Sequence, residues 1–436
     1  MLKFDSIGKS IKRYSKELLV YLRHMVIWFF LAAAIGLVVG SVSITFAYLD
    51  GRANAFRTSN PWVLFCLPLI GIIITLIYQI GGVSAERGTN LVISTLQAKS
   101  HLPHRMAPII FVSTILTHLG GGSVGREGAA LQLGGSIGSS ISRIPFIKYF
   151  RDDPGNRRIA VMCGMSAAFS AIFGTPMAAT IFSMEVVSIG IMHYSALFPC
   201  VIAANVAHRF AFFLGFDEET FYIASLPDLT AELFMHILIL SCACGILSSG
   251  FCVLLSKTHK LFGLLFKNPY LRALIGGLIF IGVILVFNRD YMGAGMNLIE
   301  SAVKGQERPY DFILKMGLTA LCIGCGYKGG EIVPSLSIGA LFGALYAKIA
   351  GVSHLSALFS EIGMTAMFCG VTNCPVTSIL IASELFSFRG TQYLLIAVAA
   401  SYVISGYYSL YADQNIVYSK FHNKYVNHRA NYHPDL

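Results

Sequence analysis

The sequence has little charge for its length. Only 12% of its 436 residues are Asp, Glu, Lys or Arg, whereas a soluble globular chain carries about 25%. Hydrophobic residues make up 55% of the chain, and its mean hydropathy is +0.67. These values exclude a string of soluble domains. Because apolar runs near the spanning length of ~20 residues recur from about residue 25 to the end, we expect an all-α polytopic protein embedded in the lipid bilayer.

The sequence also lacks the signatures of a metal site or an enzyme. Cys322 and Cys325 form a CxxC, but no second CxxC or His pair follows at zinc spacing, so we expect these thiols to be buried. No H-E-x-x-H occurs. Ser123 fits G-x-S-x-G, but nothing around it indicates the strand-turn-helix context of that motif. We expect no catalytic residue, metal or cofactor. An intramembrane enzyme is the alternative from another class, and a purified protein without hydrolytic activity would count against it.

The N-terminus does not have the form of a cleavable signal, because its charged region is too long and residues 24–49 make a full span. The net charge of +10 comes largely from basic residues in the tails. They include Lys9, Lys12, Arg13, Lys16, Arg23, Lys420, Lys424 and Arg429. The positive-inside rule therefore places both termini, residues 1–24 and 420–436, in the cytoplasm of an inner-membrane protein. Contact of the tails with anionic lipid is compatible with this interpretation, and nucleic acid is not an expected partner.

Two halves of the chain repeat one another. Residues 164–169 (GMSAAF) reappear as residues 363–368 (GMTAMF), at an offset of 199 (363 − 164). A Pro and a Glu follow at the same offset, as Pro176 and Glu185 in the first copy and as Pro375 and Glu384 in the second. Upstream, Gly128 and residues 136–138 (SIG) are echoed by Gly329 and residues 337–339 (SIG), at an offset of 201 (329 − 128). We expect membrane repeats at 25–214 and 231–419, joined by a polar linker at 215–230.

Glycine and proline interrupt the apolar stretches at matching places in the two halves. Several apolar stretches are too short or too Gly-rich to be plain spans, and others are long enough to be two helices with a break. Repeated halves with broken helices are typical of transporters, whose half-helix N-termini point at a site near the bilayer midplane. The positive end of a helix favours an anion there. For Gly134 and Gly135, close helix packing explains the glycines equally well.

The segment 121–128 (GGSVGREG) places a charged pair, Arg126 and Glu127, between two apolar stretches. Ionisable side chains in membrane sequence are costly and mark function. When it is ionised, the Glu127 carboxylate would compete with an anion for the positive helix ends; when it is protonated, it would leave the site. One side chain could thus serve as the gate and the proton carrier. A purely structural contact between Arg126 and Glu127 is the alternative.

Two further segments also place glycine and polar residues at breaks between apolar stretches. In 327–334 (YKGGEIVP), Gly329 and Gly330 let backbone approach an ion, and Pro334 fits the first turn of a helix. The amides of Glu331, Ile332 and Val333 would face the site, and Lys328 either snorkels or pairs with Glu331. In 86–91 (ERGTNL), Gly88 marks a break where Thr89 and Asn90 either donate to an anion or only start a helix.

In this order, G-R-E-G at 125–128, G-G-x-x-x-P at 329–334 and Tyr418-Ser419 resemble the pattern of CLC chloride channels and transporters. The resemblance covers about residues 60–420. It implies the CLC fold, with two inverted helical repeats per subunit and one pore in each subunit of a homodimer. Three residues take roles by this resemblance: Glu127 as the external gate, Ile332 beside the anion-binding amides, and Tyr418 as the central tyrosine. The regulatory CBS domains of many members are expected to be absent.

Several positions depart from the common pattern. The usual Gly-Ser-Gly-x-Pro is replaced by residues 86–91, where alignment on Gly88 leaves either Arg87 or Thr89 at the serine position. Ala129 stands where a Pro follows G-R-E-G, and Val186 stands where proton-coupled members carry an internal carboxylate. With Gly-Gly-Glu in place of Gly-Ile-Phe, these departures resemble the fluoride/proton antiporter branch.

These features predict a halide transporter that exchanges chloride or fluoride for protons, with Glu127 as its gate. The alternative is a passive chloride channel of the same fold, which Val186 slightly favours because its side chain cannot carry a proton. The choice between the two halides stays open, because a small and strongly hydrated anion needs more donors and the sequence does not place them.

Overall fold

The computed structural model describes residues 2–83, 88–97, 102–144, 149, 153–216, 220–223 and 226–431, with side chains from residue 13 onward. Glu86 and Arg87, and hence the register of that predicted motif, lie outside the described residues. Parts of the predicted linker and the last five residues of the predicted tail also lie outside them.

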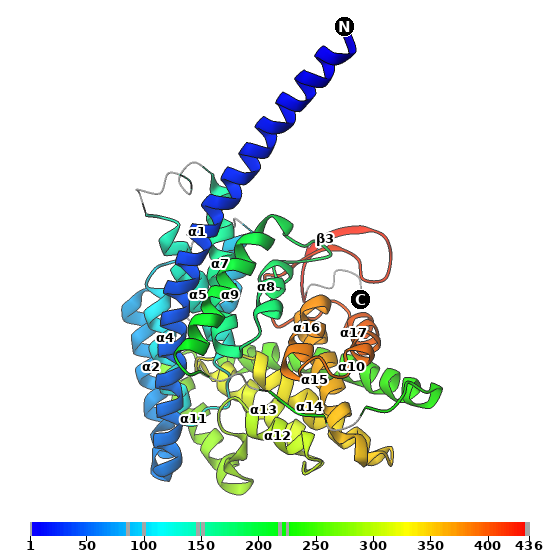
Figure 1. Ribbon diagram of the computed structural model, residues 1–436. Coiled ribbons are helices and arrows are strands. Elements are labelled where there is room, and N and C mark those ends of the chain that lie inside the picture. Colours follow the sequence, from blue (N-terminus) through cyan, green and yellow to red (C-terminus); the bar gives the residue numbers. More distant parts are fainter. Residues whose placement is uncertain are drawn as a thin grey trace.

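The described residues form helices joined by short loops (Figure 1). The first half contains α1 (Leu2–Ser59), η1 (Pro61–Cys66), α2 (Leu67–Gly81), α3 (Gly88–Leu96), α4 (Met106–Leu119), α5 (Glu127–Ile141), α7 (Pro154–Phe173), α8 (Pro176–Glu185), β1 (Ser188–Ile189), η2 (Tyr194–Ala196) and α9 (Leu197–Phe213). The second half contains α10 (Ala231–Leu265), α11 (Pro269–Val286), η3 (Arg289–Tyr291), α12 (Met296–Val303), α13 (Asp311–Cys325), α14 (Ile332–Ile349), η4 (Ser353–Leu355), α15 (Ser356–Thr372), α16 (Pro375–Leu385), α17 (Thr391–Ile404), β2 (Asn415–Tyr418) and β3 (Tyr425–Arg429).

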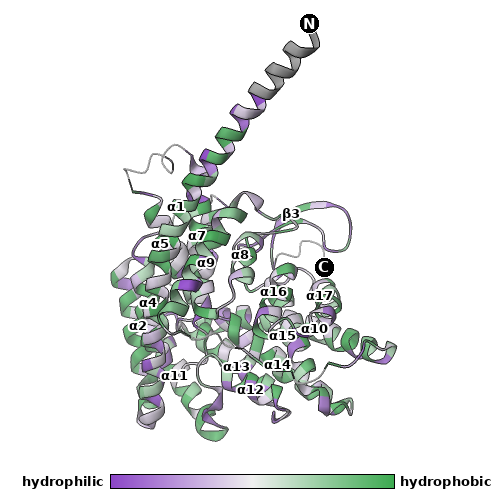
Figure 2. Cartoon of the chain, in the orientation of Figure 1, coloured by the Kyte–Doolittle hydropathy of each residue, from purple (hydrophilic) through white to green (hydrophobic). Residues whose placement is uncertain are grey.

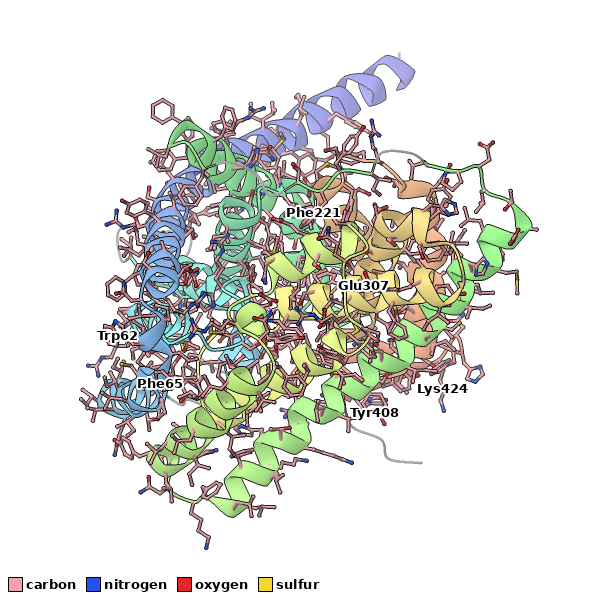
Figure 3. All side chains as sticks on the ribbon, turned by 90° about the horizontal axis from the view of Figure 1, so that it is seen from below. Trp62, Phe65, Phe221, Glu307, Tyr408 and Lys424 are labelled. Carbon is pink, nitrogen blue, oxygen red and sulfur yellow. The ribbon has the colours of Figure 1, made fainter. Side chains whose placement is uncertain are left out.

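Seven helical segments among the described residues are long and apolar enough to cross a membrane. Hydrophobic residues run along the bundled helices (Figure 2), as expected where lipid replaces water around them. α1 is longer than its predicted span: the helix continues back to Leu2, and its N-terminal end projects beyond the bundle (Figure 1). Trp62 and Phe65, 59% and 57% exposed, lie at the edge of the molecule just after α1 (Figure 3), where aromatic side chains suit a membrane surface.

Two long apolar stretches, one in each half, break at equivalent residues. α7 ends before Gly174 and α15 ends before Asn373, each in the left-handed conformation with φ of 73° and 58°. The next helices then begin at Pro176 and Pro375. A left-handed residue ends a helix, and Pro is favoured at the first helical position. The same sequence signals therefore produce the same break in each half.

Glycines bring the paired helices of each half into backbone contact. A Cβ on Gly134 would lie 2.2 Å from the Gly164 carbonyl oxygen, where α5 crosses α7. A Cβ on Gly339 would lie 2.4 Å from the Gly363 carbonyl oxygen, where α14 crosses α15. Close packing therefore accounts for Gly134. For Gly135 the nearest atom is a Val92 methyl at 2.9 Å, which is also a packing contact.

This packing corrects the predicted offset of the first repeated element. Gly134 corresponds to Gly339, and α5 begins at Glu127 where α14 begins at Ile332, so the structural offset is 205 (339 − 134, 332 − 127) rather than 201. The predicted match of the two Ser-Ile-Gly segments was therefore wrong by four residues. Four residues are about one helical turn, so the misaligned copy presents similar residues on the same face.

The offset of 199 for the second element agrees with a reciprocal pair of contacts. Glu185 at the end of α8 accepts the N–H groups of Val376 and Thr377 in the first turn of α16, at 3.1 and 2.9 Å. Glu384 in α16 accepts the N–H groups of Met177 and Ala178 in the first turn of α8, at 2.9 and 2.8 Å. Each half thus caps a helix of the other, and a carboxylate at a helix N-terminus is stabilising.

A small sheet adds to the predicted all-α architecture. Its order is β1-β2-β3, with β1 parallel to β2 (Ser188 opposite Asn415) and β2 antiparallel to β3 (Tyr418 opposite Tyr425). β3 lies at the end of the bundle from which α1 projects (Figure 1). The sheet therefore ties the end of the first half to the C-terminal segment.

Candidate functional site

The two predicted glycine motifs meet at one point. Gly125 donates its N–H to the Gly330 carbonyl at 2.7 Å, and Gly330 donates to the Gly125 carbonyl at 2.6 Å, as an isolated antiparallel bridge. A Cβ on Gly330 would lie 2.4 Å from the Gly128 nitrogen, and one on Gly329 would lie 2.3 Å from a Val124 methyl. These positions admit only glycine, because side chains would separate the two loops.

Two helices start at this crossing. α5 begins with Glu127 and Gly128, and α14 begins with Ile332 and Val333, both fully buried. Neither N-cap residue, Arg126 or Glu331, caps its helix through its side chain. The first-turn N–H groups and the positive ends of two helix dipoles are therefore concentrated in one buried place.

Glu127 lies beside the crossing in a cavity of 240 Å³, here called the Glu127 cavity. Its other lining residues are Asp50, Asn54, Arg57, His118, Arg126, Met292, Gly293, Ala294, Gly295, Met296 and Asn297. The Glu127 side chain is only 4% exposed, and its Oε1 lies 3.5 Å from Arg126 Nε. The structural contact held as the alternative is thus present, and the same carboxylate also faces the cavity.

A second cavity, of 710 Å³, lies on the other side of these loops and is here called the Tyr411 cavity. Of the predicted site residues, it is lined by Gly88, Thr89, Asn90, Gly329 and Glu331. Gly88 opens α3 with a φ of 42°, which suits glycine. The structure therefore brings the motif at 88–90 together with the motif at 329–331.

The polar side chains of α3 already have contacts within this cavity. Thr89 Oγ1 accepts a hydrogen bond from Gln132 Nε2 at 3.1 Å and lies 3.5 Å from the Gly128 carbonyl oxygen. Asn90 Oδ1 accepts the Asp413 N–H at 3.1 Å. The Asn90 oxygen thus holds the C-terminal segment, whereas the Thr89 side chain packs against the first turn of α5.

The structure corrects the prediction for the tyrosine. Tyr418 lies on β2 with 44% of its surface exposed and its ring against Tyr425, outside both cavities. Tyr411 instead lines the Tyr411 cavity and is 2% exposed. The prediction rested on the Tyr-Ser pair at 418–419. The chain turns away into the sheet after Tyr411, and this turn carries Tyr418 away from the cavities.

The Tyr411 hydroxyl has no hydrogen-bond partner in the part of the chain that the structure describes. Leaving a buried polar group unpaired costs about 1–3 kcal/mol. A hydroxyl that lines a cavity without a protein partner is available to donate to an anion.

Two polar residues of the Tyr411 cavity go beyond the sequence-based prediction: Gln132 was not predicted as a site residue, and the partner of Lys328 was left open. Gln132, 3% exposed, contacts Thr89 from the middle of α5. The sequence did carry a signal, since Gln132 is an amide in a helix that is otherwise built from small and apolar residues after Glu127. The Lys328 ammonium lies 4.8 Å from the centre of the Tyr78 ring, a cation–π arrangement that the sequence did not foresee.

The two cavities lie toward opposite faces of the membrane region. The last turns of α1 reach the Glu127 cavity through Asp50, Asn54 and Arg57. The chain then crosses back as η1 and α2, a spanning segment from Pro61 to Gly81, and Gln79 at its end lines the Tyr411 cavity. The crossing of Gly125 and Gly330 thus separates a carboxylate on one side from a carboxylate, Glu331, on the other.

Comparisons with known proteins agree with this geometry. Residues 70–406 match the family described as voltage gated chloride channel. The chain is 33% identical over 428 residues to the "Chloride/fluoride channel protein" of Pseudomonas syringae pv. tomato, covering 95% of this chain and 92% of that protein. It also resembles the crystal structure of a CLC-type fluoride/proton antiporter, with a TM-score of 0.84 and 32% identity over 89% of this chain and 98% of that chain. A slow cyanobacterial Cl−/H+ antiporter shares the fold, with a TM-score of 0.72, 20% identity, and coverage of 87% of this chain and 94% of that chain. The protein described here belongs to the voltage gated chloride channel (CLC) family of membrane anion transporters.

Proposed function

We propose that this protein exchanges fluoride for protons across the membrane, with Glu127 as the gating carboxylate. One observation carries the proposal: two uncapped helix starts meet at the bridge of Gly125 and Gly330, with the carboxylates of Glu127 and Glu331 in cavities on opposite sides. Helix starts favour an anion, and a carboxylate can exchange a proton for that favourable interaction. The assignment of fluoride rests on the relatives that carry it in their descriptions.

The anion would pass between Tyr411 and Glu127. The Tyr411 hydroxyl would donate to it in the Tyr411 cavity. The first-turn amides of α14, at Ile332 and Val333, and of α5, at Gly128, would hold it at the crossing. Hydrogen bonds to a charged partner are about twice as strong as neutral ones, and a small anion needs several of them to replace its water.

Glu331 supplies the second proton site in this proposal. Val186, at the position of the usual internal carboxylate, is buried, and its carbonyl accepts Gln414 Nε2 at 3.1 Å. The Glu331 side chain instead lines the Tyr411 cavity, and its Oε2 lies 3.6 Å from where a Gly128 Cβ would be. A proton could therefore be carried on each side of the crossing, which removes the reason to favour a passive channel.

The remaining expectations are part of the same proposal. The basic N-terminal segment, and the place of β3 at the end from which α1 projects, support cytoplasmic termini on an inner-membrane protein. A homodimer is expected from the family resemblance, and light scattering of the purified protein in detergent tests it.

Reconstitution into liposomes tests the function. A fluoride gradient should drive protons against their own gradient, at a fixed ratio, and fluoride should be carried faster than chloride. Anion flux with no proton movement would make the protein a passive channel. A faster chloride flux, still coupled to protons, would retain antiport and overturn the assignment of fluoride.

A further inference from the structure

A buried acid–base pair stands behind the G-R-E-G loop. His118 Nδ1 on α4 lies 2.6 Å from Asp50 Oδ1 on α1, and both side chains are 2% exposed. The opposite ring nitrogen, His118 Nε2, lies 3.0 Å from the Val124 carbonyl oxygen. One imidazole therefore joins the first transmembrane helix to the loop that carries the gate.

A neutral His118 beside an ionised Asp50 has one proton too few to make both contacts. A neutral imidazole has one N–H, while the Val124 carbonyl and an ionised Asp50 both only accept. Either His118 carries both N–H groups, or Asp50 carries the proton and donates to Nδ1. In both cases the pair holds one extra proton, and its release sends one H+ to the solvent of the Glu127 cavity, which both residues line.

The peptide that His118 contacts is part of the crossing itself. The Val124 carbonyl oxygen faces His118, and the N–H at the other end of the same peptide group, that of Gly125, donates to Gly330 at 2.7 Å. Because a peptide group is planar, fixing its oxygen also fixes its N–H. His118 is therefore placed to set the geometry of the bridge between the two halves without touching the ion.

Other charged groups face the pair from each neighbouring element. Arg57 on α1 donates to the His118 backbone oxygen at 2.5 Å, and Arg126 Nη1 lies 4.0 Å from Asp50 Oδ2. Arg126 Nε in turn lies 3.5 Å from Glu127 Oε1. Lys315 on α13 binds the Gly293 carbonyl of the loop that completes the cavity, at 2.7 Å. When His118 retains one N–H, an ionised Asp50 carboxylate is a stronger acceptor for it than the neutral Val124 carbonyl.

We propose that Asp50 and His118 form a proton-sensitive positioning pair that adjusts the anion pathway to the pH of the Glu127 cavity. When the pair holds its proton, His118 binds both Asp50 and Val124. When the proton leaves, the charge-assisted bond to Asp50 is kept because it is the stronger one. The Val124 peptide loses its donor, and the bridge of Gly125 and Gly330 loosens. The proposal rests on the proposed function, in which this crossing is the anion site.

The test uses a Glu127→Gln background, so that the gate itself does not titrate. Fluoride efflux from liposomes is measured at equal pH inside and outside, between about pH 5 and pH 8, the range in which histidine titrates. We expect efflux through Glu127→Gln to fall with rising pH by roughly fivefold, the size of one neutral hydrogen bond.

A second substitution, Asp50→Asn, then removes the extra proton of the pair while keeping the contacts of His118 with residues 50 and 124. In Glu127→Gln/Asp50→Asn, the amide can donate to Nδ1 of a neutral His118, whose Nε2–H still binds Val124, so efflux should persist and no longer depend on pH. Glu127→Gln/His118→Gln should also lose the pH dependence. His236→Gln in the same background is the matched control, since His236 contacts Tyr346 at 3.0 Å away from both cavities, and its profile should match that of Glu127→Gln alone.

A flat profile in Glu127→Gln alone, or an unchanged pH dependence in Glu127→Gln/Asp50→Asn, would overturn the proposal. Proton coupling is measured separately in the Glu127→Gln protein. Coupling that survives there would instead overturn the role of Glu127 as gate, so the two failures are distinguishable.

Discussion

Gly125 and Gly330 exchange two backbone hydrogen bonds across a separation of 205 residues (330 − 125). They occupy equivalent places in the two halves of the chain, each two residues before the first residue of a helix. The bridge is therefore a contact between two copies of the same structural element. It places two positive helix ends against each other, an arrangement that is unfavourable unless an anion or a carboxylate lies between them.

Replacing Gly330 by alanine should disrupt this contact. Its Cβ would lie 2.4 Å from the Gly128 nitrogen and 2.8 Å from the Gly128 Cα, both backbone atoms that cannot move aside. We expect the free energy of unfolding to fall by about 1–3 kcal/mol and fluoride transport to be lost. Gly317→Ala on α13 is the control, because among the described residues no atom outside its own helix lies within 4 Å of the added Cβ. Equal transport by the two variants would show that the crossing tolerates side chains.

The two tyrosines can be separated by removing one hydroxyl from each. Tyr411→Phe should weaken fluoride binding, measured by calorimetry in detergent, at least roughly tenfold, because a hydrogen bond to a charged group contributes about 1.5–3 kcal/mol. Tyr418→Phe should bind fluoride normally, since that side chain is exposed on β2. The reverse order of effects would restore Tyr418 as the anion ligand.

Glu331→Gln should separate proton movement from anion movement on the side of the Tyr411 cavity. The amide keeps the size of the side chain but cannot carry a proton, so fluoride flux should continue while fluoride-driven proton uptake drops to background. Glu361→Gln on α15 is a suitable control, because this buried carboxylate lines neither cavity. Normal coupling in Glu331→Gln would show that the proton takes another route.

The reciprocal caps should contribute to stability rather than to transport. Glu384→Gln removes the charge that accepts two first-turn N–H groups of α8, and we expect a loss of about 1–3 kcal/mol, seen as a lower midpoint of thermal unfolding in detergent. Glu300→Gln removes an exposed carboxylate paired with Lys304 and should change little. A Glu384→Gln protein as stable as the wild type would argue against the capping role.

The sequence carried most of the fold because its strongest signals are local. Apolar length marked the spanning helices, and Gly174 with Pro176 and Asn373 with Pro375 marked the two breaks. Short elements were harder to detect. α3 has nine residues and α12 has eight, both too short to stand out by hydropathy, and the sheet depends on pairing between segments far apart in the chain.

For the site, the motif glycines and Glu127 could be predicted because each has a local physical reason to be in membrane sequence. Which tyrosine reaches the pathway could not, since Tyr411 and Tyr418 are only seven positions apart (418 − 411) and their burial depends on how the C-terminal segment folds back. The pairing of Asp50 with His118 was also invisible, because it joins α1 to α4 and neither residue belongs to a recognisable motif.

The central claim is that the Glu127 carboxylate couples the anion to the proton. It is tested most directly by following fluoride and proton movement together in liposomes that contain wild-type or Glu127→Gln protein. We expect the wild type to take up protons in fixed proportion to fluoride leaving, and Glu127→Gln to pass fluoride with no proton uptake. Undiminished proton uptake by Glu127→Gln would contradict the account.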